Sequence, residues 1–257
     1  MATESVRKTR ESLLAERAFY LSMMAAIFLL VVWGFAPSFF LRSWLTPPPT
    51  YIDRPDWMSW TFIAHGLLAT GWLILFAVQT VLIGRKQLRL HKATGQSAYP
   101  LYLANIATGA FVGLLGARYG FHSVPFDSIT FSALPWMVIA AFAILGWAGL
   151  NERRDPQRHK RLMLLATITL ADAGIARVTV FHGLLPTWMS ATALLLIPLV
   201  LWDLATLRRL HRTTIFGGLL VAAAVLLAIP LGMSEPWHAV VSTIIGSEGM
   251  PAGKIAH

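Results

Sequence analysis

The sequence contains no cysteine, and charged residues make up only 13% of its 257 positions. Without cysteine the chain has no disulfide, no thiolate metal ligand, no cysteine-held iron–sulfur cluster and no cysteine nucleophile. A soluble domain has about 25% charged residues, so the low charge content excludes an ordinary soluble domain. Among the charged residues the acidic ones are the fewer, with 12 Asp and Glu against 21 Lys and Arg.

The motifs of several common enzyme classes are also missing. The sequence has no P-loop, no Gly-x-Gly-x-x-Gly, no Gly-x-Ser-x-Gly, no His-Glu-x-x-His and no His-x-x-x-His cluster. These absences exclude kinases, hydrolases and membrane di-iron desaturases. The last long apolar run, 214–233, has no lysine, which excludes a retinal Schiff base there.

The chain has long apolar runs instead: 56% of its residues are hydrophobic and its mean hydropathy is +0.62. Each run is close to the ~20 residues that a helix needs to cross a bilayer core. The sequence predicts an all-α integral membrane protein, a bundle of seven transmembrane helices within 18–233. A polar N-terminal segment, 1–17, precedes it, and a short interfacial helix and tail, 234–257, follow it. The predicted spans are 18–40, 57–84, 99–118, 132–150, 159–183, 186–203 and 214–233.

Lysine and arginine are distributed unevenly over the predicted loops. Sixteen of the 21 lie in 1–17, 85–98, 151–162 and 207–213, which all fall on one side of a seven-helix bundle. The positive-inside rule then places the N-terminus in the cytoplasm and the C-terminus in the periplasm of a bacterial inner membrane. The basic excess indicates contact with anionic headgroups on the cytoplasmic side, and nucleic acid is not expected as a partner.

The segment 159–183 is predicted to be the working helix. It carries an acid, Asp172, and a base, Arg177, inside an apolar length, and it ends near His182. Charges inside a bilayer cost several kcal/mol and usually face the interior of a bundle. We expect Asp172 to find a partner on another helix. Arg177, five positions further on, is expected to reach toward the outer interface.

Three predicted helices begin with histidine followed by lysine or arginine. These histidines are His91, His159 and His211. One interpretation is a cytoplasmic cluster of three imidazoles. The other is that each histidine only marks a helix start at the membrane interface.

These motifs carry a resemblance to a known group of proteins. The runs HGLLATGWLILFAVQTVLIGRKQLRLHKATG, HKRLMLLATITL, WDLATLRRLHRTTIFGGLL and EPWHAV resemble a group of uncharacterised bacterial multi-pass inner-membrane proteins, from residue 57 onward. The helix starts are loosely similar to those of haem-handling oxidase-assembly proteins and transmembrane b-type cytochromes. Unlike the cytochromes, this chain has no pair of histidines stacked within one helix.

The outer half of the bundle holds most of the candidate site residues. His65 lies about eight residues, or ~12 Å, into the second span, and Asp172 lies at a similar depth. Trp72 and Gln79 follow His65 at spacings of seven, on the same face of that helix. Asn105 and Arg118 belong to the third span. We expect His65 and Asp172 to face one interior site.

These residues fit several functions, and the sequence does not decide among them. His65 and His182 are the best pair for holding haem b, and they are the only metal ligands expected. His65 and Asp172 suit a quinone site, while Asp172, Arg177 and Gln79 suit a small ion-coupled transporter. The chain is otherwise a non-catalytic subunit or an assembly factor of a larger membrane complex, or forms a homo-oligomer. A redox or cofactor-binding protein is the first choice, with His65, Asp172 and Arg177 as reactive residues.

Overall fold

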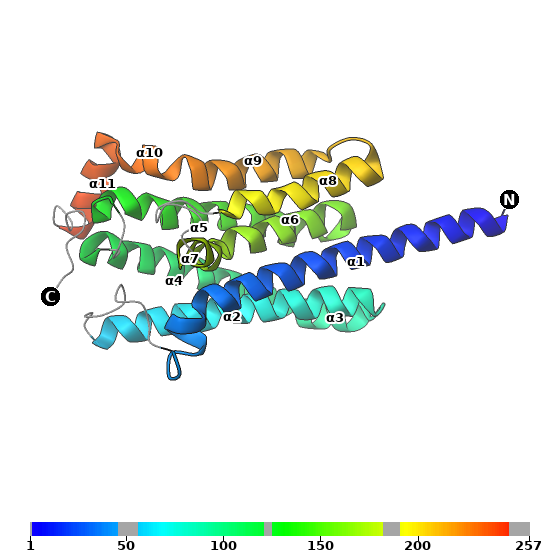
Figure 1. The fold of residues 1–257 in the computed structure, drawn as a ribbon, viewed down its shortest axis with the longest axis horizontal. Helices are drawn as coiled ribbons and strands as arrows, with labels where there is room; N and C mark the ends of the chain where they lie inside the picture. The colour runs from blue at the N-terminus through cyan, green and yellow to red at the C-terminus, as the bar shows by residue number, and fades with distance from the viewer. Residues whose placement is uncertain (1, 46–55, 121–124, 182–190, 247–257) are drawn as a thin grey trace.

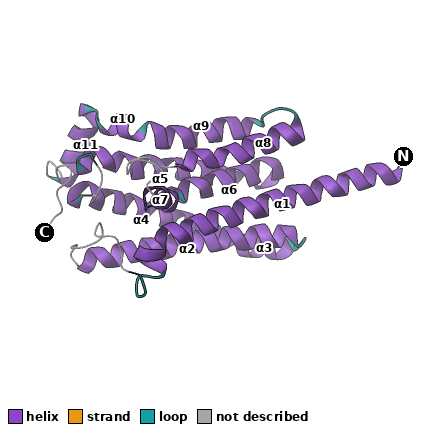
Figure 2. Ribbon diagram, in the orientation of Figure 1, coloured by secondary structure: helices purple, strands orange, loops and turns teal. Residues whose placement is uncertain are grey.

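The computed structural model describes residues 2–45, 56–120, 125–181 and 191–246, and every regular element within these ranges is helical (Figure 2). Most helices lie side by side in an elongated bundle, and the N-terminal part of α1 extends beyond it (Figure 1). The longer helices are α1 (Ala2–Phe35), α2 (Asp56–Gly84), α4 (Ala98–Tyr119), α5 (Ser128–Asn151), α6 (Pro156–Leu170), α8 (Leu196–Leu207) and α9 (Arg212–Leu226). The shorter ones are α3 (Leu88–Thr94), α7 (Asp172–Phe181), α10 (Ala228–Gly232) and α11 (Glu235–Ile245).

Four helical stretches are long and apolar enough to cross a membrane: Glu11–Phe40, Met58–Gly84, Leu88–Tyr119 and Ser128–Arg154. Two shorter apolar stretches, Ala191–Leu207 and Arg212–Leu226, accompany them. Large apolar side chains cover the outside of the bundle, among them Leu29, Phe216 and Leu219. The prediction of an all-helical membrane protein is thus confirmed. The number of crossings and their direction stay predictions.

The predicted fifth span, 159–183, is not one continuous helix. It consists of α6 and α7, which are separated by a turn at Ala171. Figure 1 looks along the axis of α7, so α7 runs across the bundle whereas α6 runs along it. Asp172, the first residue of α7, belongs to a residue type that favours helix starts over helix interiors. The far end of the predicted span, including His182, lies outside the described residues.

Prolines shape the two remaining predicted spans. The described part of 186–203 begins as a 3₁₀ helix, Ala191–Leu195. It becomes α-helical at Leu196, two residues before Pro198. Span 214–233 breaks at Leu227 into α9 and α10. Pro230 has no N–H to donate to the carbonyl four residues earlier, which explains this break. The predicted final helix is present as α11.

The start of α11 follows the expectation from the sequence. The Ser234 side chain accepts a hydrogen bond from the Trp237 N–H at 3.4 Å, and a proline stands in the first turn. The indole N–H of Trp237 donates to the Ile129 carbonyl at 2.9 Å. This contact and the apolar residues Val241 and Ile245 pack α11 against α4 and α5.

The core lies along α5 and α6, whose neighbours are α4, α9 and α10. Its fully buried apolar side chains include Phe142, Leu164, Leu165 and Ile168. On the other side, α1 packs against α7, and their backbones nearly touch. A Cβ atom added at Gly34 would lie 2.0 Å from the Gly174 carbonyl oxygen. Only glycine at both positions permits this approach.

We therefore expect Gly34→Ala to lower the stability of the bundle by about 1–3 kcal/mol, since the new methyl group overlaps a backbone oxygen and forces α1 away from α7. The thermal unfolding midpoint of the detergent-purified protein measures this effect. Gly218→Ala is the matched control, because its Cβ would lie 3.9 Å from the nearest side-chain atom. Equal midpoints for the two variants would contradict the close contact between α1 and α7.

Candidate functional site

One face of α2 carries three polar side chains, and each forms a hydrogen bond with a threonine of another helix. The bonds join His65 to Thr108 of α4 at 3.0 Å, Trp72 to Thr167 of α6 at 3.1 Å, and Gln79 to Thr94 of α3 at 2.7 Å. The sequence placed the three α2 residues on one face, and the structure confirms this. The indole of Trp72 is buried and meets the Phe142 ring edge-on. The hydrogen bonds of this face attach α2 to three neighbours.

The hydrogen bond of His65 determines which ring nitrogen carries the proton. The Thr108 hydroxyl donates to the Ala104 carbonyl at 2.7 Å, so its oxygen is left to accept from His65 Nδ1–H. A neutral imidazole protonated at Nδ1 has a lone pair at Nε2. No group in the described parts of the chain donates to Nε2. His65 therefore offers an acceptor, or a ligand atom, at Nε2.

A buried amide lies beside His65. The Asn105 side chain is fully buried, and its Nδ2 donates to the carbonyls of Leu101 at 2.8 Å and of Leu68 at 3.2 Å. Its Oδ1 has no hydrogen-bond partner within the described residues. Gly109 follows on the same helix, and a Cβ there would lie 3.4 Å from His65 Cε1. A lone pair and an unsatisfied carbonyl oxygen thus occur together where α2 meets α4.

Asp172 is held separately from His65. Its side chain is 4% exposed, and Thr192 of the 3₁₀ helix Ala191–Leu195 donates to Oδ1 at 2.6 Å. It forms no hydrogen bond or ion pair with His65. Arg177 donates to the Ala173 carbonyl at 2.7 Å, and its guanidinium lies 4.3 Å from the centre of the Phe35 ring. The structure brings His65 to α4 and Asp172 to the segment that precedes α8.

Arg118 and His182 are the two remaining predicted site residues. Arg118 donates to the Ile245 carbonyl at 3.2 Å and so attaches α4 to the end of α11. His182 lies outside the described residues, so the predicted pair of haem ligands, His65 and His182, stays a prediction.

The sequence did not predict the most deeply buried ion pair. Arg161 of α6 and Asp203 of α8 are 1% and 0% exposed, and their side chains meet at 2.5 Å. The second oxygen of Asp203 accepts from the Thr214 hydroxyl at 2.6 Å and from the His211 backbone N–H at 3.0 Å. Arg161 also donates to Gln157. Both residues lie at the ends of apolar runs on the basic side, where charged residues are common, so the sequence pattern did not single out their pairing.

Two of the three predicted interfacial histidines meet at the end of the bundle where α6 begins. The rings of His91 and His159 are 6.4 Å apart between centroids and nearly perpendicular. His211 has a different role, because its Nδ1 accepts from the Thr213 N–H and caps the start of α9. Within the described ranges, no three His, Asp or Glu residues form a metal-binding group.

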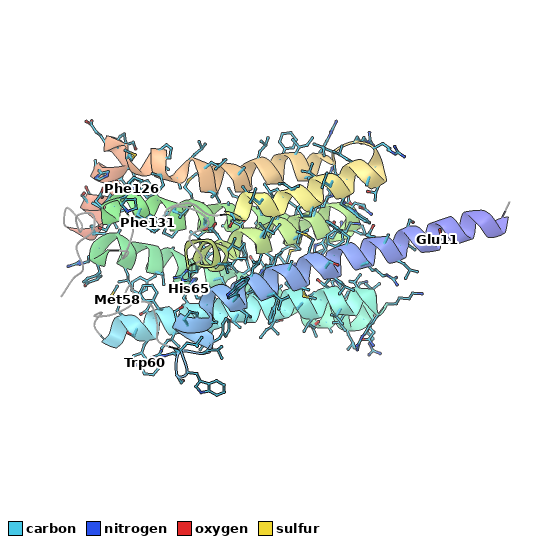
Figure 3. All side chains as sticks on the ribbon, in the orientation of Figure 1. Glu11, Met58, Trp60, His65, Phe126 and Phe131 are labelled. Carbon is cyan, nitrogen blue, oxygen red and sulfur yellow. The ribbon has the colours of Figure 1, made fainter. Side chains whose placement is uncertain are left out.

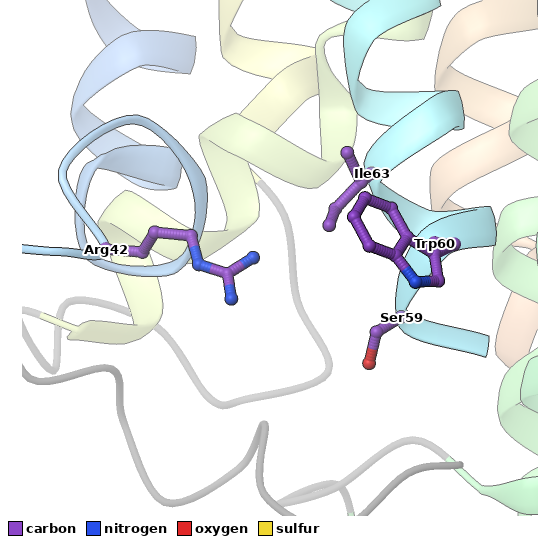
Figure 4. Close-up of a pocket in the computed structure, with 4 residues that line it drawn as sticks. All are labelled: Arg42, Ser59, Trp60 and Ile63. Carbon is purple, nitrogen blue, oxygen red and sulfur yellow. The ribbon is translucent and has the colours of Figure 1, made fainter. Parts of the chain in front are cut away.

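A surface pocket of about 620 Å³ opens beside the first turn of α2. Figure 4 shows the guanidinium of Arg42 on one side of it and Ser59, Trp60 and Ile63 on the other. Trp60 and His65, both labelled in Figure 3, belong to α2. His65 does not line this pocket.

Comparison with models of protein families, with curated proteins and with solved structures finds no match for this chain.

We expect removal of one partner of the buried ion pair to be costly. Asp203→Leu or Arg161→Met alone should destabilise the protein by about 3–5 kcal/mol, because each leaves an unpaired buried charge. The double variant should lose clearly less than the sum of the two, and chemical unfolding in detergent measures this. Arg158→Gln is the control, since its exposed pair with Glu152 at 3.1 Å should contribute only about 0–1 kcal/mol. Additive losses would show that the pair is not coupled.

Proposed function

We propose that this chain is a membrane protein that binds a quinol, with His65 as the residue that recognises it. The observation that carries the proposal is the hydrogen bond from His65 Nδ1–H to Thr108, which leaves a lone pair at Nε2. A quinol hydroxyl is a donor of the kind this nitrogen can accept. Recognition of this hydroxyl, and acceptance of its proton, are the roles that we assign to His65.

The surroundings of His65 support a quinol more than haem b. A six-coordinate haem needs two histidines on facing helices, whereas His65 is the single histidine at the α2–α4 contact among the described residues. The unsatisfied Asn105 Oδ1 nearby is a second acceptor for a hydroxyl group. Trp72 and Gln79, proposed from the sequence as cofactor contacts, hold α2 to α6 and α3. We therefore assign Trp72 and Gln79 a structural role, which is to hold α2 in position around the site.

A second candidate function is ion-coupled transport, which the interruption between α6 and α7 favours. Discontinuous membrane helices often form ion or substrate sites near the middle of a bilayer. Here the interruption carries a buried carboxylate, Asp172, bonded to Thr192. The two candidates differ in the residue that matters. Asp172→Asn should leave quinol affinity unchanged if His65 alone binds the quinol, and should abolish flux if the chain is a transporter.

The quinol proposal predicts saturable binding of a short-chain ubiquinol analogue to the detergent-purified protein, followed by tryptophan fluorescence. His65→Phe should weaken binding about tenfold, which is the value of one hydrogen bond of ~1.4 kcal/mol. Thr108→Val should weaken it by a smaller factor, because Nδ1 loses the acceptor that fixes its proton.

His211→Asn is the control for this experiment, since His211 caps α9 and Asn is also a good capping residue. Equal affinities of the wild type and His65→Phe, or no saturable binding by the wild type, would overturn the proposal. A Soret band in the visible spectrum would assign haem b to the chain in place of a quinol.

We further propose that the chain crosses the membrane seven times, with its N-terminus in the cytoplasm, as the distribution of lysine and arginine predicts. The break at Ala171 does not change the proposed number of membrane crossings. Figure 1 shows that α6 starts, and α8 ends, at the same end of the bundle. The segment between them thus leaves that end and returns to it, as a pair of spans does.

This topology predicts that reporter domains fused after Lys92 and after Arg161 are cytoplasmic, and that one fused after Glu248 is periplasmic. Paired phosphatase and fluorescent-protein fusions in a bacterial host give the result. A cytoplasmic signal after Glu248 means an even number of crossings and rejects the proposed orientation.

A further inference from the structure

The pocket beside the first turn of α2 has no role in the quinol proposal. Its volume is about 620 Å³, and it is lined by Arg42, Ser59, Trp60 and Ile63. The guanidinium of Arg42 points across the pocket toward Ser59 and Trp60 (Figure 4). Ligand pockets in proteins usually measure about 300–1,000 Å³, so this one is large enough for a small molecule or for the head of a larger one.

The segment that carries Arg42 is held against α2. The π-helix Ala36–Phe40 follows α1 directly, and Arg42 is the second residue of the turn after it. Phe39 of the π-helix packs on Gly66 of α2, where an added Cβ atom would lie 2.8 Å from the phenyl ring. Short π-helices are rare and are frequently found at functional sites. This contact fixes the guanidinium and the start of α2 on opposite sides of the pocket.

The polar side chains that line the pocket are all hydrogen-bond donors. A guanidinium has five N–H groups and no acceptor, an indole has one N–H, and the hydroxyl of Ser59 donates as well. Within the described ranges, Arg42, Ser59 and Trp60 form no hydrogen bond or ion pair through their side chains. These donors and the permanent positive charge fit an anion with several acceptor oxygens. Phosphate matches the planar guanidinium, which binds two of its oxygens at once.

The pocket also has an apolar wall, formed by Ile63 and by the ring of Trp60, which is 70% exposed. A small inorganic anion makes no use of such a wall, whereas a phosphate attached to an apolar body does. The wall therefore favours an amphiphile as the ligand.

The position of the pocket along the bundle points to a lipid. Arg42 comes two residues after the apolar stretch Glu11–Phe40, and Ser59 is the second residue of the stretch Met58–Gly84. The ends of two candidate membrane spans thus meet at the pocket, where a spanning helix reaches the headgroups of a bilayer. Trp44, which is 85% exposed, lies in the same turn as Arg42. Exposed tryptophans are typical of this depth.

We propose that the pocket binds the phosphate group of a membrane phospholipid. Arg42 pairs with two phosphate oxygens, and the Ser59 hydroxyl and the Trp60 indole N–H donate to the phosphate as well. Ile63 and the Trp60 ring contact the glycerol and the first carbons of the acyl chains. In the orientation proposed above, this lipid belongs to the outer leaflet. The proposal does not depend on the binding of a quinol at His65.

The test is the binding of dihexanoyl phosphatidylglycerol, whose short chains keep it soluble, to the full chain in a non-ionic detergent. Native mass spectrometry counts the bound lipid, and we expect saturable binding of one lipid per chain. Arg42→Gln should weaken binding about tenfold or more, because the charged pair with two hydrogen bonds is lost. Ser59→Ala and Trp60→Phe should each weaken it by a smaller factor, because each removes one neutral donor.

Two substitutions outside the pocket are the matched controls. Arg85→Gln removes an exposed arginine just beyond the other end of α2, and Trp44→Phe removes an exposed indole N–H beside Arg42. Both variants should bind the lipid as the wild type does. Arg42→Lys should bind with an affinity between those of the wild type and Arg42→Gln, because it keeps the charge and loses the planar pair of donors. Without lipid, all variants should have the thermal midpoint of the wild type, which separates a loss of binding from a loss of folding.

Two further probes identify the source of the phosphate. Dihexanoylglycerol has the same chains without phosphate, and glycerol phosphate has the phosphate without chains. We expect neither to displace the phospholipid. Displacement by dihexanoylglycerol would show that the pocket recognises only apolar chains, and displacement by glycerol phosphate would assign it to a soluble phosphate compound. Either result, or equal affinities of the wild type and Arg42→Gln, would overturn the proposal.

Discussion

The buried ion pair of Arg161 and Asp203 is the interaction on which the basic end of the bundle depends. Two charges removed from water are tolerated only when each is paired and its remaining hydrogen-bonding capacity is used. Here Arg161 binds Gln157 as well, and Asp203 receives Thr214 and the N–H of His211. The carboxylate therefore connects α6, α8 and the start of α9. The ion pair thus joins the two ends of the chain segment that begins with α6 and ends with α8.

The polar face of α2 solves a related problem within the apolar part of the bundle. In the absence of water, a polar side chain needs a partner on another helix, and small hydroxyl residues provide one without separating the helices. Each α2 residue on this face meets such a threonine. The same hydrogen bonds also orient the side chains of the candidate site. Thr108 sets the tautomer of His65, and Trp72 and Gln79 hold α2 in position around it. Packing and the candidate site thus use the same side chains.

The sequence predicted the features that composition and local pattern determine. The membrane class, the long apolar helices, the shared face of His65, Trp72 and Gln79, and the start of α11 all follow from hydropathy, helical periodicity and capping chemistry. The structure confirms each of them. These features depend on residues close together in the chain.

Pairing across the bundle was harder to predict. The expectation of one site for His65 and Asp172 compared their depths on two straight helices, but the turn at Ala171 sends α7 across the bundle. Hydropathy averages over a window and does not register such a turn. Asp172 instead meets Thr192, a residue without charge that no pattern singled out. The pair of Arg161 and Asp203 was missed because both residues were assigned to the ends of spans, where charges are common.

The contact between α1 and α7 has a consequence for how the protein is made. Gly34 and Gly174 touch through their backbones, and Arg177 lies over Phe35 at the same contact, yet the two helices are about 140 residues apart in the chain. At a synthesis rate of ~5–20 residues per second, α1 emerges roughly 7–28 s before α7. During that time Gly34 lacks the backbone contact that Gly174 later provides. The packing of α1 is therefore completed only after a distant part of the chain has been made, although its contact with α2 can form earlier.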